Sequence, residues 1–415
     1  MTPTVFRHAL PYGVAFMLLV LGAPQLAAAQ AVGAGPLTST LGATEPTTGV
    51  FSWGRVKFAP GLVVDELGRD PNVFDERDDP KQDWVFRGTP DVSMFASVRF
   101  ARLSAYAGSE LAYYHKYKGE RSAGREYRAR LDLLFGLLQP FVAGGETRTR
   151  NRPNGEIDVR ADRVEREAGG GISYQFGAHQ SIYVATVIYN NEFRNSLEEG
   201  IELSTALNRE STNYSLGVRT DITPLAQLTL SGAFQEDRFE SLPIRDSDIR
   251  IGTAALQIGV EAALSGNIAV SYRDFRPVDP AVKPNKNVGV EAAITYPFLE
   301  IGRLSLGFRR GLEYSFDATE AYYEENTVNL SYTHRLFGEV DFQARGSKSL
   351  FDYGFREGSP ARQDALQSIA GSLGYNLRNR TRVALNYENA RRRSPAFPAR
   401  DYDRRRVYLS WAYAF

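Results

Sequence analysis

The sequence predicts an all-β fold: a transmembrane, antiparallel, up-and-down β-barrel of about 18 strands with both termini in the periplasm. Three observations carry this prediction. Apolar and polar residues alternate with a period of two, and the alternating segments are roughly 9–11 residues long, enough to cross a bilayer at a tilt. The connections between segments alternate between tight and long, which is typical of bacterial outer-membrane barrels.

The final segment shows the period of two most clearly, and residues 382–388 and 288–298 repeat it. Successive side chains of a strand point to opposite faces, so each segment has one apolar face. The chain also ends on Phe415, which resembles the signal read by the barrel insertion machinery. The apolar positions of the final segment are Val407, Leu409, Trp411 and Tyr413.

The spacing of the connections separates a barrel from a soluble β-sandwich, in which tight and long connections have no reason to alternate. Tight turns are expected near Phe100, Gln139, Ala178, Pro224, Ser265, Glu300, Gly338 and Asn379. Long loops are expected near residues 68–82, 119–125, 150–161, 195–208, 240–247, 277–286, 317–322, 351–363 and 393–401.

Three regions follow from the composition along the chain. Residues 1–29 read as a cleavable signal peptide, with Arg7 before an apolar run and small residues at its end. The alternative is a retained transmembrane anchor. Residues 30–52 are small, polar and proline-dotted, typical of a flexible periplasmic lead-in. Residues 53–415 form the barrel, and the protein is expected in the outer membrane of a Gram-negative cell.

The overall charge and the rare reactive residues exclude several functions. Lysine plus arginine and aspartate plus glutamate each number 49, so no nucleic-acid partner is indicated. Cysteine is absent, and only His115, His179 and His334 follow the signal peptide, without a serine or aspartate motif beside them. We therefore expect no enzyme, no catalytic residue, no cofactor and no metal site. The acidic loop around residues 70–79 could hold Ca²⁺, but its spacing favours a solvated loop.

The alternation also assigns faces. The outer face must be apolar, so charged residues at alternating positions are predicted to line the pore. Arg310 is an exception, because it shares its face with Leu306, Phe308 and Leu312; it is expected near an interface or at a bulge. The predicted pore-lining residues are Glu110, Arg130, Asp132, Arg219, Arg273, Glu291, Arg309, Glu313, Arg345, Arg382 and Glu388.

Aromatic residues near the connections are expected to form the two girdles of a membrane barrel. One set lies near the tight turns: Phe135, Phe176, Phe298, Phe337 and Phe415. The other set lies near the long loops: Tyr113, Tyr189, Phe193, Phe234, Phe239 and Tyr322.

The last long loop is rich in arginine and predicts a basic extracellular mouth. Such a field could attract an anionic glycan, or the arginines could contact phosphates of lipopolysaccharide in the outer leaflet, the interpretation we favour. The barrel has no plug-sized domain, so the lumen should be open or narrowed by an inward-folded loop. The arginines assigned to the mouth are Arg392, Arg400, Arg404 and Arg406.

Two short stretches carry a family resemblance. Residues 58–64 (FAPGLVV) with 70–76 (DPNVFDE), and the later segment 400–403 (RDYD), resemble the first strand, first loop and last hairpin of outer-membrane β-barrel porins associated with exopolysaccharide export loci. The resemblance spans roughly residues 50–415. It implies a barrel of about 18 strands that passes a secreted polysaccharide across the outer membrane beside a periplasmic polysaccharide-export protein. It implies no catalytic residue.

The sequence thus leaves three functions open. The first is a passive conduit for secreted polysaccharide. The second is a general diffusion porin for small hydrophilic solutes. The third is a receptor or structural barrel without transport.

Overall fold

The computed structural model describes residues 51–194, 196–280, 282–298, 301–317, 320–354, 362–377 and 381–414. The predicted signal peptide, residues 1–29, lies outside the described residues. So do residues 30–50 of the predicted lead-in and the terminal Phe415.

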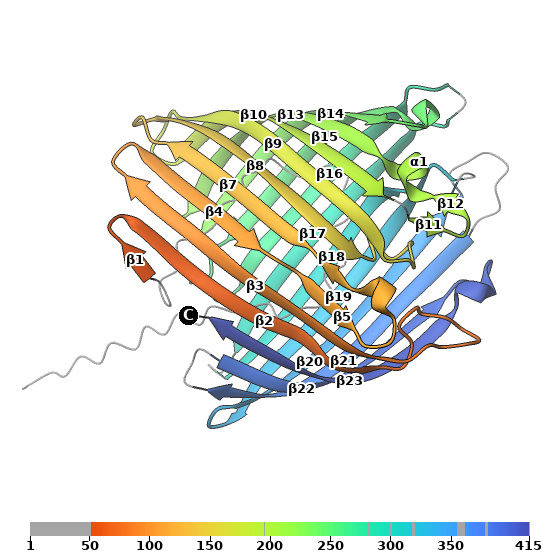
Figure 1. Ribbon diagram of the computed structural model, residues 1–415. Coiled ribbons are helices and arrows are strands. Elements are labelled where there is room, and N and C mark those ends of the chain that lie inside the picture. Colours follow the sequence, from red (N-terminus) through yellow and green to blue (C-terminus); the bar gives the residue numbers. More distant parts are fainter. Residues whose placement is uncertain are drawn as a thin grey trace, which may run out of the picture.

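One antiparallel sheet winds round and closes on itself (Figure 1). Each long strand pairs with the next along the chain, and the last pairs with the first, from Gly61 opposite Ala414 to Arg69 opposite Val407. The predicted closed barrel of 18 strands is confirmed. Its strands are β2 (Val56–Asp70), β3 (Asp83–Val98), β4 (Ala101–Gly108), β7 (Arg125–Leu133), β8 (Leu138–Asn151), β9 (Ala161–Gln175), β10 (Gln180–Arg194), β13 (Arg209–Thr223), β14 (Ala226–Phe239), β15 (Ser247–Ile258), β16 (Ser265–Pro277), β17 (Asn285–Phe298), β18 (Gly302–Tyr314), β19 (Tyr322–Phe337), β20 (Val340–Tyr353), β21 (Arg362–Leu377), β22 (Thr381–Arg393) and β23 (Tyr402–Ala414).

Shorter elements decorate this wall. β1 pairs with the start of β2, and β5 continues β4 along β3. No helix in the described part of the chain is long and apolar enough to cross a membrane. The short elements are β1 (Phe51–Trp53), β5 (Leu111–Tyr114), η1 (Lys118–Glu120), β6 (Ser122–Ala123), β11 (Leu197–Glu198), β12 (Ile201–Glu202), α1 (Leu203–Leu207), η2 (Pro243–Arg245) and η3 (Pro398–Arg400).

The two ends of the barrel differ as the sequence predicts. At one end, here called the turn end, strands are joined by short connections such as Gly338 and Glu339 between β19 and β20. Gly338 has a φ of 53°, a left-handed conformation that glycine adopts without strain. At the other end, here called the loop end, the long connections gather, including the one that contains α1 (Figure 1).

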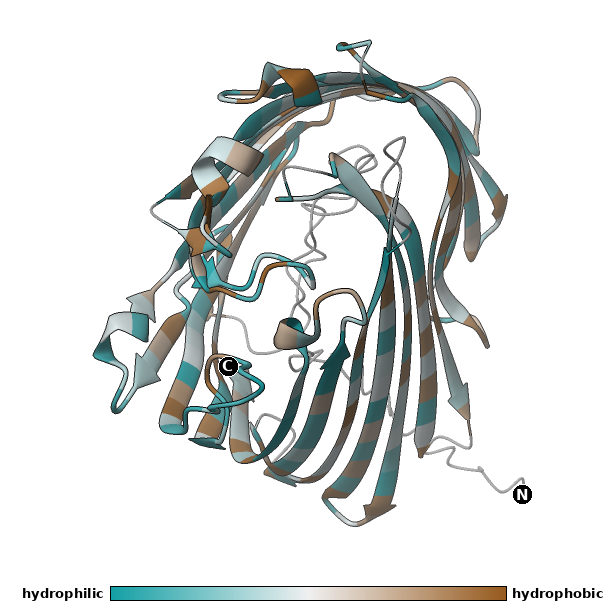
Figure 2. Ribbon diagram, turned by 90° about the vertical axis from the view of Figure 1, so that its right-hand side faces the viewer, coloured by the Kyte–Doolittle hydropathy of each residue, from teal (hydrophilic) through white to brown (hydrophobic). Residues whose placement is uncertain are grey.

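The strand register sorts side chains onto two faces. Leu385 lies opposite Leu409 on β23 and Leu373 on β21, and these leucines are 53%, 45% and 52% exposed. Their neighbours along the strands point inward: Asn386 donates a hydrogen bond to Ser410 at 2.9 Å. The exposed apolar face is therefore the lipid-facing wall, and the alternation is visible as banding along the strands (Figure 2).

Arg310 lies on this outer wall, as its parity requires. It is half-exposed and pairs with Glu324 at 2.9 Å, near the loop end of β18. This placement fits the interface position predicted for Arg310. The alternative prediction is a β-bulge at Arg310, but the register of β18 with β17 and β19 is regular there. A register shift lies in β2, between Val64 and Leu67.

The predicted aromatic girdles are only partly correct. Phe135, Phe176 and Phe337 are 55%, 55% and 70% exposed at the turn end. At the loop end the prediction is wrong for Phe193, Phe239 and Tyr322, which are 3%, 4% and 2% exposed and belong to an apolar cluster. It is also wrong for Tyr189, which packs against a second buried cluster. Phe193, Phe239 and Tyr189 lie at strand positions that face the lumen, and Tyr322 lies where the β18–β19 hairpin folds inward.

The assignment of alternate β22 side chains to the lipid and the lumen can be tested directly. We expect Leu385→Arg to lower the free energy of unfolding of the barrel in vesicles by about 2–4 kcal/mol, because it places a charge in hydrocarbon. Asn386 lies one residue on, faces the lumen and donates its side-chain N–H groups to Ala384, Tyr408 and Ser410. Because arginine also carries N–H donors, Asn386→Arg should have a net cost of only about 1 kcal/mol. Urea titrations read by the heat-modifiable gel mobility of the barrel measure both. Equal losses in the two variants would mean that the face assignment is wrong.

Candidate functional site

The tip of the β18–β19 hairpin folds into the barrel instead of extending the wall. Tyr314 donates a hydrogen bond to Asp237 of β14 at 2.6 Å, and its ring contacts Phe239 with centroids 4.9 Å apart. In the sheet, β14 and β18 are separated by β15, β16 and β17. The contact therefore crosses the interior.

Two further connections join this tip. Leu203 and Leu207 of α1 are buried in the same apolar cluster. Arg245 of η2 donates to the carbonyl of Asp317 at 2.6 Å and to that of Ala206 at 3.2 Å. Together the β18–β19 tip, α1 and η2 fill one side of the loop end, so the mouth is much narrower than the strand count alone implies.

The connection between β8 and β9, residues 152–160, crosses the remaining space and is here called the constriction loop. At its start Arg152 pairs with Asp75 at 3.0 Å. At its far side Asp158 pairs with Arg392 of β22 at 2.6 Å. Gly155 lies so close to the buried Phe351 ring that an added Cβ would come within 2.3 Å of it, so a larger residue there would require the ring to move.

Glu156 fastens the constriction loop to the β18–β19 tip. Its side chain is fully buried, accepting hydrogen bonds from the Ser315 hydroxyl at 2.5 Å and from the Phe316 N–H at 3.2 Å. Burial raises the pKa of Glu156 to about 7, against the opposing effects of the Ser315 hydrogen bond and of Arg400. This carboxyl therefore titrates near neutral pH.

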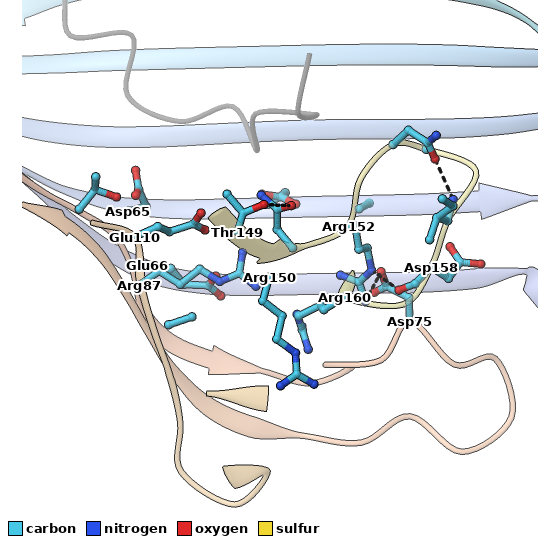
Figure 3. A pocket seen from close by; sticks show the side chains of 18 of the residues that line it. Asp65, Glu66, Asp75, Arg87, Glu110, Thr149, Arg150, Arg152, Asp158 and Arg160 are labelled. Carbon is cyan, nitrogen blue, oxygen red and sulfur yellow. Dashed lines mark hydrogen bonds and ion pairs between the residues drawn. The ribbon is translucent and has the colours of Figure 1, made fainter. Parts of the chain in front are cut away.

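A cavity of about 490 Å³ borders the constriction loop and the inner faces of β2–β4 and β20–β23. In Figure 3, Asp65 and Glu110 lie at one end of it, and Arg152, Arg160 and Asp75 lie together at the other. The cavity is the candidate site for a solute in transit, because it lies between the constriction loop and the inner wall of the barrel.

Ion pairs between the wall strands line the middle of the cavity. Arg406 pairs with Glu66 at 2.9 Å and with Glu388 at 2.8 Å. The register shift in β2 brings Asp65 and Glu66 to the cavity together. Within the described residues, no ion pair is formed by Asp65 or Glu110, so these carboxylates are available to a solute.

The register places the predicted pore-lining residues that belong to strands on the inward side, and Glu110, between β4 and β5, borders the cavity. Arg130 pairs with Asp132 at 2.7 Å, and Arg382 pairs with Asp341 at 2.7 Å. Most are therefore held by neighbours rather than reaching freely into water; their part in conduction is a proposal. The other placements are Glu110 and Glu388 in the cavity, Arg219 over the Tyr183 ring, Arg309 against Glu313 and Glu325, Glu291 opposite Arg309, Arg345 bonded to Gln343, and Arg273 buried on β16.

The predicted basic mouth differs from what the structure contains. Arg392, Arg400 and Arg406 are 2%, 7% and 6% exposed. They and Arg404 are matched by carboxylates, as Arg404 is by Asp75 at 2.9 Å. The even-numbered positions of β22 and β23 face the lumen, which places Arg392, Arg404 and Arg406 inside. Arg400 lies in η3 and pairs with Asp158 of the constriction loop. These arginines therefore form ion pairs in the interior and are not open cations at the rim.

Several functional residues were not singled out from the sequence. Glu66, Glu156 and Asp158 hold the arginines and the constriction loop, yet nothing local distinguishes them from other acidic residues. Asp75 belongs to the acidic loop, but it faces Arg152 and Arg404. In the part of the chain that the structure describes, no group of three or more potential ligands could hold a metal ion.

The closed barrel with a charged, narrowed lumen defines an outer-membrane porin. Residues 66–415 match the family described as Putative beta-barrel porin 2, and the chain belongs to this family. No functionally curated protein matches the sequence.

Solved porins share the fold. Pseudomonas aeruginosa OccK2 (OpdF), determined in complex with glucuronate, is 13% identical with a TM-score of 0.50, covering 86% of this chain and 98% of its own. Acinetobacter baumannii OccAB3 is 11% identical with a TM-score of 0.51, covering 88% of this chain and all of its own. At these identities the likeness shows the fold alone.

Glu156 makes the mouth sensitive to pH. The pKa of this carboxyl is raised to about 7 with the loop folded inward and returns to about 4.3 in water, so the inward state binds the proton more tightly. Inward folding is therefore favoured at acidic pH and weakens as the pH rises toward 7. We expect single-channel recordings to show more frequent loop fluctuations at pH 8 than at pH 5.

Glu156→Gln serves as the matched variant, because the amide does not titrate and keeps one acceptor for the Ser315 hydroxyl. Its recordings should show the same frequency of fluctuations at both pH values. A pH response that persists in this variant would assign the effect to another group.

Proposed function

We propose that this porin is a passive outer-membrane channel for small hydrophilic solutes, with its loop end facing outward and its turn end facing the periplasm. The observation that carries the proposal is the constriction loop, which leaves a polar cavity of about 490 Å³ at the mouth. Small-molecule sites in proteins enclose about 300–1,000 Å³, so the cavity matches a solute of that size.

The lining supports hydrophilic solutes. Ser347, Thr89 and Tyr106 contribute hydroxyl groups, and Asp65 and Glu110 contribute carboxylates without ion-pair partners in the described residues. These groups can exchange hydrogen bonds with a solute that has shed part of its water. OccK2, a porin of the same fold, was solved in complex with glucuronate, itself a small hydrophilic molecule.

A conduit for secreted polysaccharide, the other function suggested by the sequence, has less support. A polymer would have to displace the constriction loop, which is held at Asp75, Arg392 and the β18–β19 tip. Removing one partner of a buried ion pair costs about 3–5 kcal/mol. The family resemblance alone supports this function, and with it a periplasmic export partner.

Liposome swelling with sugars of increasing length tests the proposal. Monosaccharides and disaccharides should enter quickly, and oligosaccharides of six or more units (an order-of-magnitude limit set by the cavity size) should enter slowly or not at all. Absence of swelling with every sugar would contradict a channel. Equal rates for short and long sugars would favour the polymer conduit.

The variant Asp158→Asn links the size limit to the loop. It removes the carboxylate shared by Arg392 and Arg400, so intermediate oligosaccharides should enter several-fold faster. Glu236→Gln changes an exposed carboxylate on the outer wall and should leave all rates unchanged. If Asp158→Asn left the size limit unchanged, the loop would not be the constriction.

A further inference from the structure

The arginine-rich hairpin of β22 and β23 has a second face. Its even-numbered arginines point into the lumen, whereas Arg391, Arg393 and Arg405 occupy the odd-numbered, outward positions shared with Leu385 and Leu409. Arg391 and Arg393 are 48% and 41% exposed at the side chain, and Arg405 is also exposed. The outer wall therefore carries a cluster of cations here.

One carboxylate forms ion pairs with this cluster of arginines. Asp403 accepts from Arg391 at 2.7 Å and from Arg393 at 2.8 Å. Within the described residues Arg405 forms no ion pair. Lys348 of β20 is an exposed outward cation of the same wall, since it lies opposite Gln367, which in turn lies opposite Arg391. We call Lys348, Arg391, Arg393 and Arg405 the outer cationic patch.

The outer charges of β7–β10 are matched. Across β7–β10 a chain of ion pairs joins arginines and glutamates, at 2.9 Å, 3.1 Å, 2.6 Å and 3.2 Å. Its members are Arg125, Glu146, Arg166, Glu192 and Arg194. The outer wall at β20–β23 thus differs from that at β7–β10. A second cation-rich stretch lies on β15–β17, where Arg250 and Lys286 both lie opposite Asp274, the partner of Arg276.

The position of the outer cationic patch along the barrel axis indicates what it binds. Along β23 the outward residues run from Tyr413 and Leu409 through Val407 to Arg405, and along β22 from Leu385 through Tyr387 to Arg391. The cations therefore begin where the apolar band ends toward the loop end. In a membrane this is the level of the lipid headgroups, and guanidinium groups match phosphate in both charge and geometry.

We propose that the outer cationic patch binds the phosphate groups of a phosphorylated lipid in the leaflet at the loop end. Arg391 and Arg393 approach one phosphate together because they project from the same side of β22, two residues apart. Arg405 completes the contact from the neighbouring strand. The acyl chains of the lipid then lie along the apolar band below, on Val407 and Leu409, so one molecule satisfies both surfaces.

Native mass spectrometry of the full barrel in nonionic detergent tests the proposal, with bis-phosphorylated lipid A as the probe. The triple variant Arg391→Gln, Arg393→Gln, Arg405→Gln should bind it at least tenfold more weakly than the unchanged protein. Lipid A stripped of both phosphates should bind as weakly to the unchanged protein. Heat-modifiable gel mobility verifies that each variant is folded.

The matched control is Arg125→Gln, Arg166→Gln, Arg194→Gln, which removes as many outer arginines from the paired wall and should keep binding within twofold. Equal loss in both triple variants, or undiminished binding of the dephosphorylated lipid, would overturn the proposal. Full competition by inorganic phosphate at equal concentration would also overturn it, since the patch would then recognise a free ion. Channel activity is not part of the readout, so the outcome is independent of the proposed transport function.

Discussion

The hydrogen-bonding requirement of the backbone governs this protein. Hydrocarbon offers no partner to a free N–H or C=O group, so a sheet can cross a membrane only when its last strand pairs with its first. Here that seam is β2 with β23, and the shift between Val64 and Leu67 is accommodated within it. Closure sets the alternation of faces, and the alternation drives every charged side chain of the membrane-spanning wall toward the lumen or toward the two ends.

The many charged side chains in the lumen must be paired with side chains of opposite charge. Desolvated ions are costly unless they are paired, and the interior meets this need with contacts between distant parts of the chain, such as Arg406 with Glu66 and Glu388. An ion pair of the same kind holds the constriction loop through Asp158, and Glu156 adds hydrogen bonds to the β18–β19 tip. Ion pairing in the lumen and narrowing of the mouth are therefore one arrangement: the loop supplies the carboxylates that the wall arginines require.

The sequence predicts the wall well because its signals are local. Period-two alternation and connection length need only neighbouring residues, and they place the strands, the turns and the inward face of Arg309 or Glu388. The interior contacts are not local. Arg392 and Asp158 lie 234 positions apart, so no pattern identifies them as partners, and the arginines of the last hairpin look like an exposed patch. Parity alone could have divided them, into Arg392 inside and Arg391 outside.

The central claim is that the constriction loop lies inside the conducting barrel. The chain has no cysteine, so the variant Glu156→Cys, Ser315→Cys introduces one thiol pair at side chains that now share a 2.5 Å hydrogen bond. Because cysteine is shorter than the glutamate it replaces, a short bis-maleimide joins the two thiols in place of a direct disulfide. The account predicts that this reagent cross-links the folded barrel and that the cross-linked channel still conducts small ions. A barrel that folds without forming the cross-link, or one that stops conducting once cross-linked, would contradict it.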